Sequence, residues 1–94
     1  MPFIVLSHWK TTDWTDELEA LAQDTFVPMI LAAGAVRVRM VRTGDRSFTV
    51  VTEYADAAAA EAAQEKIQAI RSKAATELPM SLDGTEGAMA FAAS

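Results

Sequence analysis

The amino-acid sequence predicts an α+β fold, with strands and helices in the order β-α-β-β-α-β. Three stretches alternate apolar and polar residues in the way of half-buried strands, namely residues 2–10, 35–42 and 47–54. Elsewhere, apolar residues recur at the three- and four-residue spacing of an amphipathic helix. The chain has 94 residues, a usual size for one domain, so we expect a single domain over residues 1–94.

The first predicted strand, residues 2–10, is rich in β-branched and aromatic residues. Alternation divides its side chains between two faces of the sheet. One face carries Phe3, Val5, Ser7 and Trp9, and the other carries Ile4, Leu6, His8 and Lys10. Trp9 is therefore expected to point toward the helices, and His8, the only histidine, to the opposite side.

The first predicted helix begins after Thr12 and Asp13, which are suitable N-cap residues. Pro28 lies inside the helical pattern, lacks a backbone donor and restricts the residue before it. We therefore expect the helix to break or kink there and to resume as a short turn, with Gly34 just after its end. The predicted apolar stripe consists of Trp14, Leu18, Leu21, Ala22, Thr25 and Met29.

The next two strands form a predicted hairpin around the turn sequence TGDR. A two-residue loop would place Arg37 opposite Thr52, whereas an odd-length loop would place Arg37 opposite Glu53. The second register pairs opposite charges and keeps the apolar side chains on one face, so we expect an odd-length loop with a bulge. The apolar face then contains Val36, Val38, Met40, Phe48, Val50 and Tyr54.

A second helix is predicted over residues 57–77, with Asp56 as its N-cap and Pro79 after its end. Its buried stripe consists of Ala63, Ile67, Ile70 and Ala74. The residues expected in water are Glu61, Glu65, Lys66, Arg71 and Lys73. The sequence SLDGTEG is expected to be a loop, and residues 87–93 the last strand.

This element order is that of the ferredoxin-like fold, one four-stranded antiparallel sheet with both helices on one face. Its usual strand order, 4-1-3-2, places the strand that carries His8 in the middle of the sheet. Hydrophobic residues make up 51% of the chain, which is rich for so small an interior. Surplus apolar surface is typical of an interface, so we expect a homodimer through the open sheet face.

The stretch GAVRVRMVRTGDRSFTVVTEYAD, residues 34–56, resembles the middle of dimeric α/β-barrel proteins. These include the antibiotic-biosynthesis-monooxygenase-like, stress-responsive and muconolactone-isomerase-like groups. The resemblance implies that two ferredoxin-like protomers pack sheet on sheet into a barrel, each with a pocket between its helices and its own sheet. Some members oxidise aromatic polyketides without a cofactor. Others degrade haem with an Asn, a Trp and a His, a set that this chain, which has no Asn, cannot complete.

The composition argues against several classes of function. The formal net charge is −5, whereas nucleic acids and anionic membranes are bound by clustered Lys and Arg. Without cysteine and with one histidine, the chain offers no disulfide, thiolate nucleophile or His-rich metal site. It shows no basic leader and no long apolar run, so we expect a cytoplasmic protein. We also expect no bound metal and no cofactor.

The candidate site residues gather around the end of the first strand. His8 is a candidate catalytic base because imidazole titrates near neutral pH, provided that it turns toward the pocket. The alternative for His8 is a half-exposed polar residue on the barrel side. The predicted pocket for a small hydrophobic or aromatic substrate consists of Trp9, Trp14, Met29, Met40 and Tyr54. Core packing is the alternative for the same aromatic side chains.

Two further features each allow two interpretations. Arg37, Arg39 and Glu53 would either hold an anionic substrate or form a cross-strand ion pair or polar seam in the dimer. The element order also occurs in RNA-recognition domains. That class needs exposed stacking aromatics, but Val50 stands where a second ring is wanted, and the net charge has the wrong sign.

The sequence thus supports two functions. The first is a cofactor-independent monooxygenase-like enzyme that acts on a small hydrophobic or aromatic molecule. The second is a non-catalytic dimeric ligand-binding or stress-associated protein, and the sequence leaves open whether the protein is an enzyme. A deep pocket with a titratable group in its wall favours the first, and a closed core beside Trp14 would exclude it.

Overall fold

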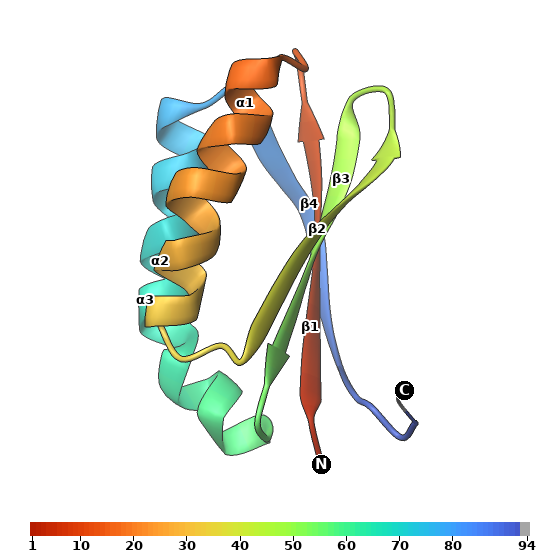
Figure 1. The fold of residues 1–94 in the computed structure, drawn as a ribbon, viewed down its shortest axis with the longest axis vertical. Helices are drawn as coiled ribbons and strands as arrows, with labels where there is room; N and C mark the ends of the chain where they lie inside the picture. The colour runs from red at the N-terminus through yellow and green to blue at the C-terminus, as the bar shows by residue number, and fades with distance from the viewer. Residues whose placement is uncertain (93–94) are drawn as a thin grey trace.

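The computed structural model describes residues 1–92, which form a four-stranded antiparallel sheet with helices over one face (Figure 1). The sheet order is β2-β3-β1-β4, so β1 is an interior strand, as predicted. The elements are β1 (Phe3–Thr11), α1 (Asp16–Leu21), the π-helical turn η1 (Ala22–Phe26), α2 (Val27–Ala32), β2 (Arg37–Gly44), β3 (Ser47–Tyr54), α3 (Ala57–Glu77) and β4 (Met80–Met89).

The β2–β3 hairpin has the predicted register, with Arg37 opposite Glu53. The register shifts between Arg42 and Gly44, and this bulge supplies the odd residue that the alternation demands. Of the interpretations of these charges, a direct Arg37–Glu53 ion pair is not formed, because no salt bridge within residues 1–92 joins the two side chains, while the polar seam in a dimer stays a prediction. Arg37 is exposed at the sheet edge, where hydration competes with a surface ion pair.

Of the break or kink predicted at Pro28, the break does not occur, and the structure instead shows a local π-helical turn just before this residue. The π turn η1 directly precedes it, and Val27 keeps helical dihedral angles of φ −57° and ψ −50°. A π turn widens the backbone ladder by one residue, which is how a helix can accommodate a residue without an N–H group. Segments α1, η1 and α2 therefore follow one another without interruption.

The start of that helix also differs from the prediction. Its N-cap is Thr15, whose Oγ1 accepts a hydrogen bond from the backbone N–H of Leu18 at 3.1 Å. Thr12 is engaged elsewhere, because its backbone N–H donates to the carbonyl of Pro79 at 2.8 Å. The strand β1 thus extends to Thr11, and the helix begins later than local capping signals suggest.

The last strand begins at Met80, so the prediction of a loop over SLDGTEG is wrong. This segment pairs along β1 in antiparallel register, with a bulge opposite His8 and Trp9. Backbone hydrogen bonds to an interior strand can order a segment whose side chains have poor strand propensity. The strand ends at Met89, and residue 93 of the predicted strand lies outside the described residues.

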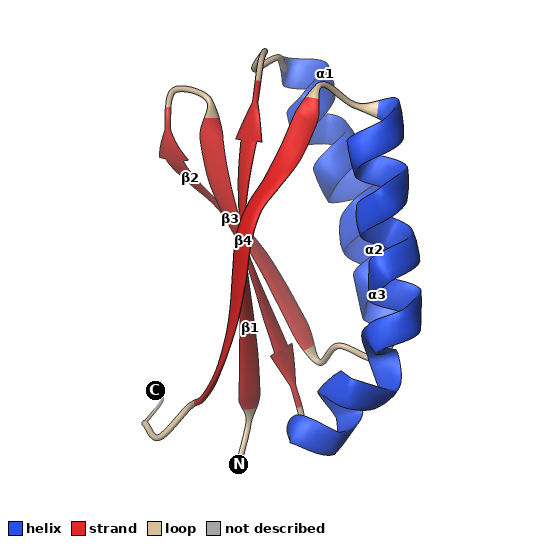
Figure 2. Cartoon of the chain, turned by 180° about the vertical axis from the view of Figure 1, so that it is seen from behind, coloured by secondary structure: helices blue, strands red, loops and turns tan. Residues whose placement is uncertain are grey.

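The core lies between the sheet and the helices, and Figure 2 shows the other sheet face without a covering layer. Helix α3 has the predicted bounds, and Asp56 caps it by accepting from the backbone N–H of Ala59 at 2.8 Å. Gly34 follows α2 with φ +122°, a conformation that favours glycine. None of the helices in residues 1–92 is long and apolar enough to cross a membrane.

Candidate functional site

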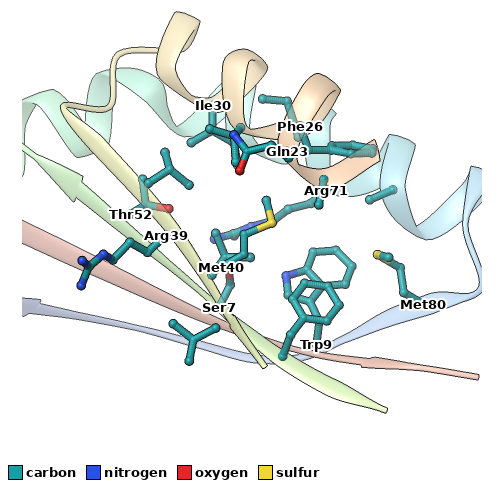
Figure 3. A pocket seen from close by; sticks show the side chains of 18 of the residues that line it. Ser7, Trp9, Gln23, Phe26, Ile30, Arg39, Met40, Thr52, Arg71 and Met80 are labelled. Carbon is teal, nitrogen blue, oxygen red and sulfur yellow. The ribbon is translucent and has the colours of Figure 1, made fainter. Parts of the chain in front are cut away.

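A cavity of about 620 Å³ lies between the sheet and the helices (Figure 3). Its volume falls within the range of small-molecule sites, roughly 300–1,000 Å³. The sheet contributes Ser7, Trp9 and Tyr54, and α3 contributes Arg71. A closed core beside Trp14 is therefore not what the chain forms, because Trp14 also borders this cavity.

Aromatic rings form one wall of the cavity. Trp9, only 5% exposed, stacks on Phe48 with ring centroids 6.2 Å apart and planes within 4°. Trp14 meets the same Phe48 ring edge to face, at 6.0 Å and 75°. Offset and edge-to-face contacts of this kind stabilise aromatic clusters and hold their orientation. The structure thus brings the two tryptophans together around Phe48, and Met40 and Tyr54 line the same cavity.

Trp14 is held at the rim by two polar contacts. Its indole Nε1 donates to Oε2 of Glu19 at 2.7 Å. The guanidinium carbon of Arg42 lies 4.2 Å from the ring centroid, within the range of a cation–π interaction. These contacts come from α1 and β2 and fix an aromatic plane beside the cavity.

Three hydroxyl groups lie on the sheet side of the cavity. Ser7, Thr52 and Tyr54 are buried residues, at 5%, 6% and 2% exposure. Within residues 1–92, every side-chain nitrogen or oxygen atom that is fully enclosed by protein has a hydrogen-bond partner. Among the described residues none of the three hydroxyls has a hydrogen-bond partner, so each must border open space, and all three residues line the cavity where a ligand can meet them.

Arg71 is the functional candidate that sequence reasoning missed. It was expected in water, but it is half-buried in the cavity wall, and Figure 3 shows it reaching into the cavity. Burial lowers the pKa of Arg71, and nearby Tyr54 opposes this. A signal was present: Arg71 follows Ile70 and stands four residues after Ile67, at the edge of the apolar stripe.

His8 lies on the opposite face of the sheet and does not reach the cavity. Its Nδ1 is 3.0 Å from Oγ1 of Thr49, and its Nε2 is 2.8 Å from Oε1 of Glu86. Strand alternation dictates this side, so the condition under which His8 was a candidate base is not met. Glu86 is an orienting carboxylate that the sequence did not indicate, because its strand was expected to be a loop.

Met29 packs against the core but is not part of the cavity wall, contrary to the prediction. The π turn η1 is the reason. One extra residue in a turn rotates all later side chains around the helix axis. The lining stripe therefore continues from Ala22 to Phe26 and Ile30, instead of Thr25 and Met29.

Comparisons with known proteins now add to this geometry. No protein-family model and no curated protein matches the chain. The fold, however, has solved counterparts. NE2512 of Nitrosomonas europaea, a protein of unknown function, is similar with a TM-score of 0.70 and 19% identity, covering 99% of this chain and 92% of that one.

Three further structures share the ferredoxin-like fold. HapK of Hahella chejuensis gives a TM-score of 0.71 and 14% identity over 100% of this chain and 96% of its own. MupZ of Pseudomonas fluorescens gives a TM-score of 0.71 and 15% identity, and the match covers 92% of this chain and 69% of MupZ. A dimeric ferredoxin-like protein from an uncultured marine organism gives a TM-score of 0.67 and 13% identity, and the match covers 99% of this chain and 97% of that protein. At identities this low, the structural similarity establishes a shared fold and nothing more specific.

Tyr54 yields a direct pH prediction. Burial raises its pKa above the ordinary value of 10.0, and the charge of Arg71 opposes this only in part. Because the folded protein disfavours the phenolate, the stability contributed by neutral Tyr54 is complete below pH 10 and is lost as pH rises through the folded pKa.

The chain has one tyrosine, so an ultraviolet absorbance titration reports Tyr54 alone. We expect its midpoint to lie higher in the native protein than in urea. We also expect the free energy of unfolding to fall more steeply between about pH 9 and about pH 11 in the wild type than in Tyr54→Phe. Equal midpoints in the native and unfolded chains would contradict the buried position of the hydroxyl.

Proposed function

We propose that this chain is a homodimeric protein, one domain per protomer, that binds one small aromatic molecule in the cavity of each protomer. The observation that carries the proposal is a cavity of about 620 Å³ walled by Trp9, Trp14 and Phe48. Ordered rings offer flat apolar surfaces against which a planar molecule can stack. The hydroxyls on the sheet side add the few polar contacts that orient a ligand in an otherwise apolar site.

A second copy of the chain is the proposed occupant of the open sheet face. That face carries a half-buried to exposed apolar patch of Ile4, Leu6, Val41 and Val51, of which Val41 is 46% exposed. Charged residues border the patch, as in many stable interfaces. The similar protein from an uncultured marine organism is described as dimeric, which supports the same assembly here.

Monooxygenase-like chemistry is the second candidate, and the position of Arg71 favours it. A guanidinium in the cavity wall would stabilise an ionised phenol, the form that gives up electrons to O₂ most readily. For 1-naphthol, one molecule of O₂ would give 1,4-naphthoquinone and one molecule of water. The substrate supplies all the electrons in this reaction, so no cofactor is required.

The two candidate functions differ in whether the protein consumes O₂. If the protein is an enzyme of this type, O₂ uptake with 1-naphthol should exceed the protein-free rate and should fall in Arg71→Met. If O₂ uptake equals the protein-free rate, the protein does not oxidise 1-naphthol, and ligand binding is left as the proposed function.

Binding itself is tested by titration with 2-naphthamide, a neutral planar molecule. In Trp14→Phe, Trp9 is the only tryptophan, so its fluorescence reports the cavity wall directly. We expect saturable quenching, with calorimetry giving one site per chain. Val38→Phe fills part of the cavity and should weaken binding about tenfold or more, a loss of roughly 1.4 kcal/mol.

Val36→Phe is the matched control, because Val36 is 58% exposed and lies outside the cavity wall. It should bind 2-naphthamide like the wild type. Absence of saturable binding, or equal affinity in the two phenylalanine variants, would count against the proposed site.

A further inference from the structure

The cavity wall carries the opposite charge to the chain as a whole. Its charged residues are Arg39, Arg42, Arg71 and one carboxylate, Glu19, a formal charge of +2. The chain has a formal net charge of −5. A positive site within an acidic protein attracts anions that the rest of the surface repels.

Only one of these charges is both unengaged and directed inward. Arg42 lies over Trp14 and donates to the backbone carbonyls of Gly44 and Asp45, at 3.1 and 2.8 Å. Arg39 is exposed, and in Figure 3 its side chain points away from the cavity. The Glu19 carboxylate accepts from the Trp14 indole.

Arg71 differs from the other three. It is half-buried and reaches into the cavity, and it has no ion pair or side-chain hydrogen bond within residues 1–92. A guanidinium offers five N–H donors in a planar fork that matches a carboxylate. A partly desolvated and unpartnered cation is unfavourable until an anion joins it, which gives an anionic ligand an advantage over a neutral one.

The groups around Arg71 suit the same ligand. Ser7, Thr52 and Tyr54 contribute neutral hydroxyls to the cavity. Because burial raises its pKa, Tyr54 remains a protonated donor at neutral pH. Within the described chain Glu19, at the Trp14 end of the wall, is the one carboxylate that borders the cavity, so beside Arg71 an anion meets mainly donors.

We propose that the ligand is a planar aromatic carboxylic acid, whose carboxylate binds Arg71 while its ring lies against Trp9 and Phe48. This inference rests on the proposed function, since it names the class of molecule that the same cavity takes. Arg71 is then the residue that selects an aromatic acid over the neutral analogue of the same shape.

The experiment compares 2-naphthoate with 2-naphthamide, which differ in charge but hardly in shape. Calorimetry on the wild type at low ionic strength should give about 10- to 100-fold tighter binding for 2-naphthoate, the usual contribution of a hydrogen bond to a charged group. In Arg71→Met this preference should disappear, while the affinity for 2-naphthamide changes less than about threefold. Arg71→Lys should restore part of the preference, because it keeps the charge without the fork.

Lys66→Met is the matched control. Lys66 is exposed on α3, so this variant removes the same charge from the same helix without altering the cavity. It should keep the wild-type preference. Binding of 2-naphthamide by Arg71→Met also shows that this variant retains an intact cavity.

The outcomes separate the two proposals. Equal affinity of the wild type for both molecules, or an unchanged preference in Arg71→Met, would overturn the role of Arg71 and leave aromatic binding in place. Binding of neither molecule would overturn both proposals.

Discussion

Trp9→Ala is expected to lower the free energy of unfolding by about 3–5 kcal/mol, the usual loss for a large aromatic side chain removed from a core. Trp9 is 5% exposed, stacks on Phe48 and belongs to the same buried cluster as Tyr54. Domains of this size are stable by only about 5–15 kcal/mol, so much of the folded state's margin would be lost. Urea unfolding followed by far-ultraviolet circular dichroism measures the change.

Trp14→Ala is the control for this prediction. Trp14 is only half-buried at the rim, where it contacts Glu19, Arg42 and the edge of Phe48. We expect a loss of about 1 kcal/mol, which is typical of partly exposed positions. If the two substitutions had equal effects, Trp9 would not be the centre of the packing between sheet and helices.

Val51→Asp is expected to convert the proposed homodimer into monomers. Val51 lies in β3 on the open face, directly opposite Leu6 of β1 and Arg39 of β2. A carboxylate in the middle of an apolar interface loses its hydration, and neighbouring Arg39 would offset this only in part, so we expect a cost of several kcal/mol at each copy. In the monomer the same carboxylate stays at a half-exposed position beside Arg39, so the fold should persist.

Sedimentation velocity measures the result, with circular dichroism to confirm folding. Gln64→Asp places the same side chain on the exposed face of α3 and should leave the dimer intact. A wild-type chain that sediments as a monomer, or a Val51→Asp variant that remains dimeric, would contradict the assignment of this face to a second copy.

The cavity and the open face lie on opposite sides of the sheet, so the two sites can be separated. We expect monomeric Val51→Asp to bind 2-naphthamide with an affinity close to that of the wild type. Apart from Arg39 and Val41 of the edge strand β2, the cavity wall comes from the helices and from the helix-facing side of the sheet of the same protomer.

Local periodicity correctly predicted the features that depend on residues close together in the sequence. Period-two alternation assigned Trp9 to the helix side and His8 to the other side, because successive side chains in a strand must point in opposite directions. The pairing of Arg37 with Glu53 followed from the same rule, since a slip of one residue would expose the apolar face. Asp56 before an alanine-rich run likewise marked the start of α3 correctly.

The features that periodicity missed depend on strand pairing between distant segments and on a local change in the helical hydrogen-bond ladder. The segment SLDGTEG becomes part of β4 because β1 supplies its backbone partners, a contact between opposite ends of the chain. The π turn before Pro28 rotates the helix so that Ile30, and not Met29, borders the cavity. A single inserted residue in a helical ladder changes no composition or average spacing, so the sequence carries almost no signal for it.

The candidate site divides in the same way. Its aromatic wall and its orientation toward the helices could be derived from the strand pattern, because Trp9 and Tyr54 are separated from His8 by alternation alone. The charge of the site could not, because an arginine at the edge of an apolar helical stripe is usually solvated. Only the packing of α3 over the sheet turns Arg71 inward, where the surrounding protein removes part of the water that would otherwise hydrate it.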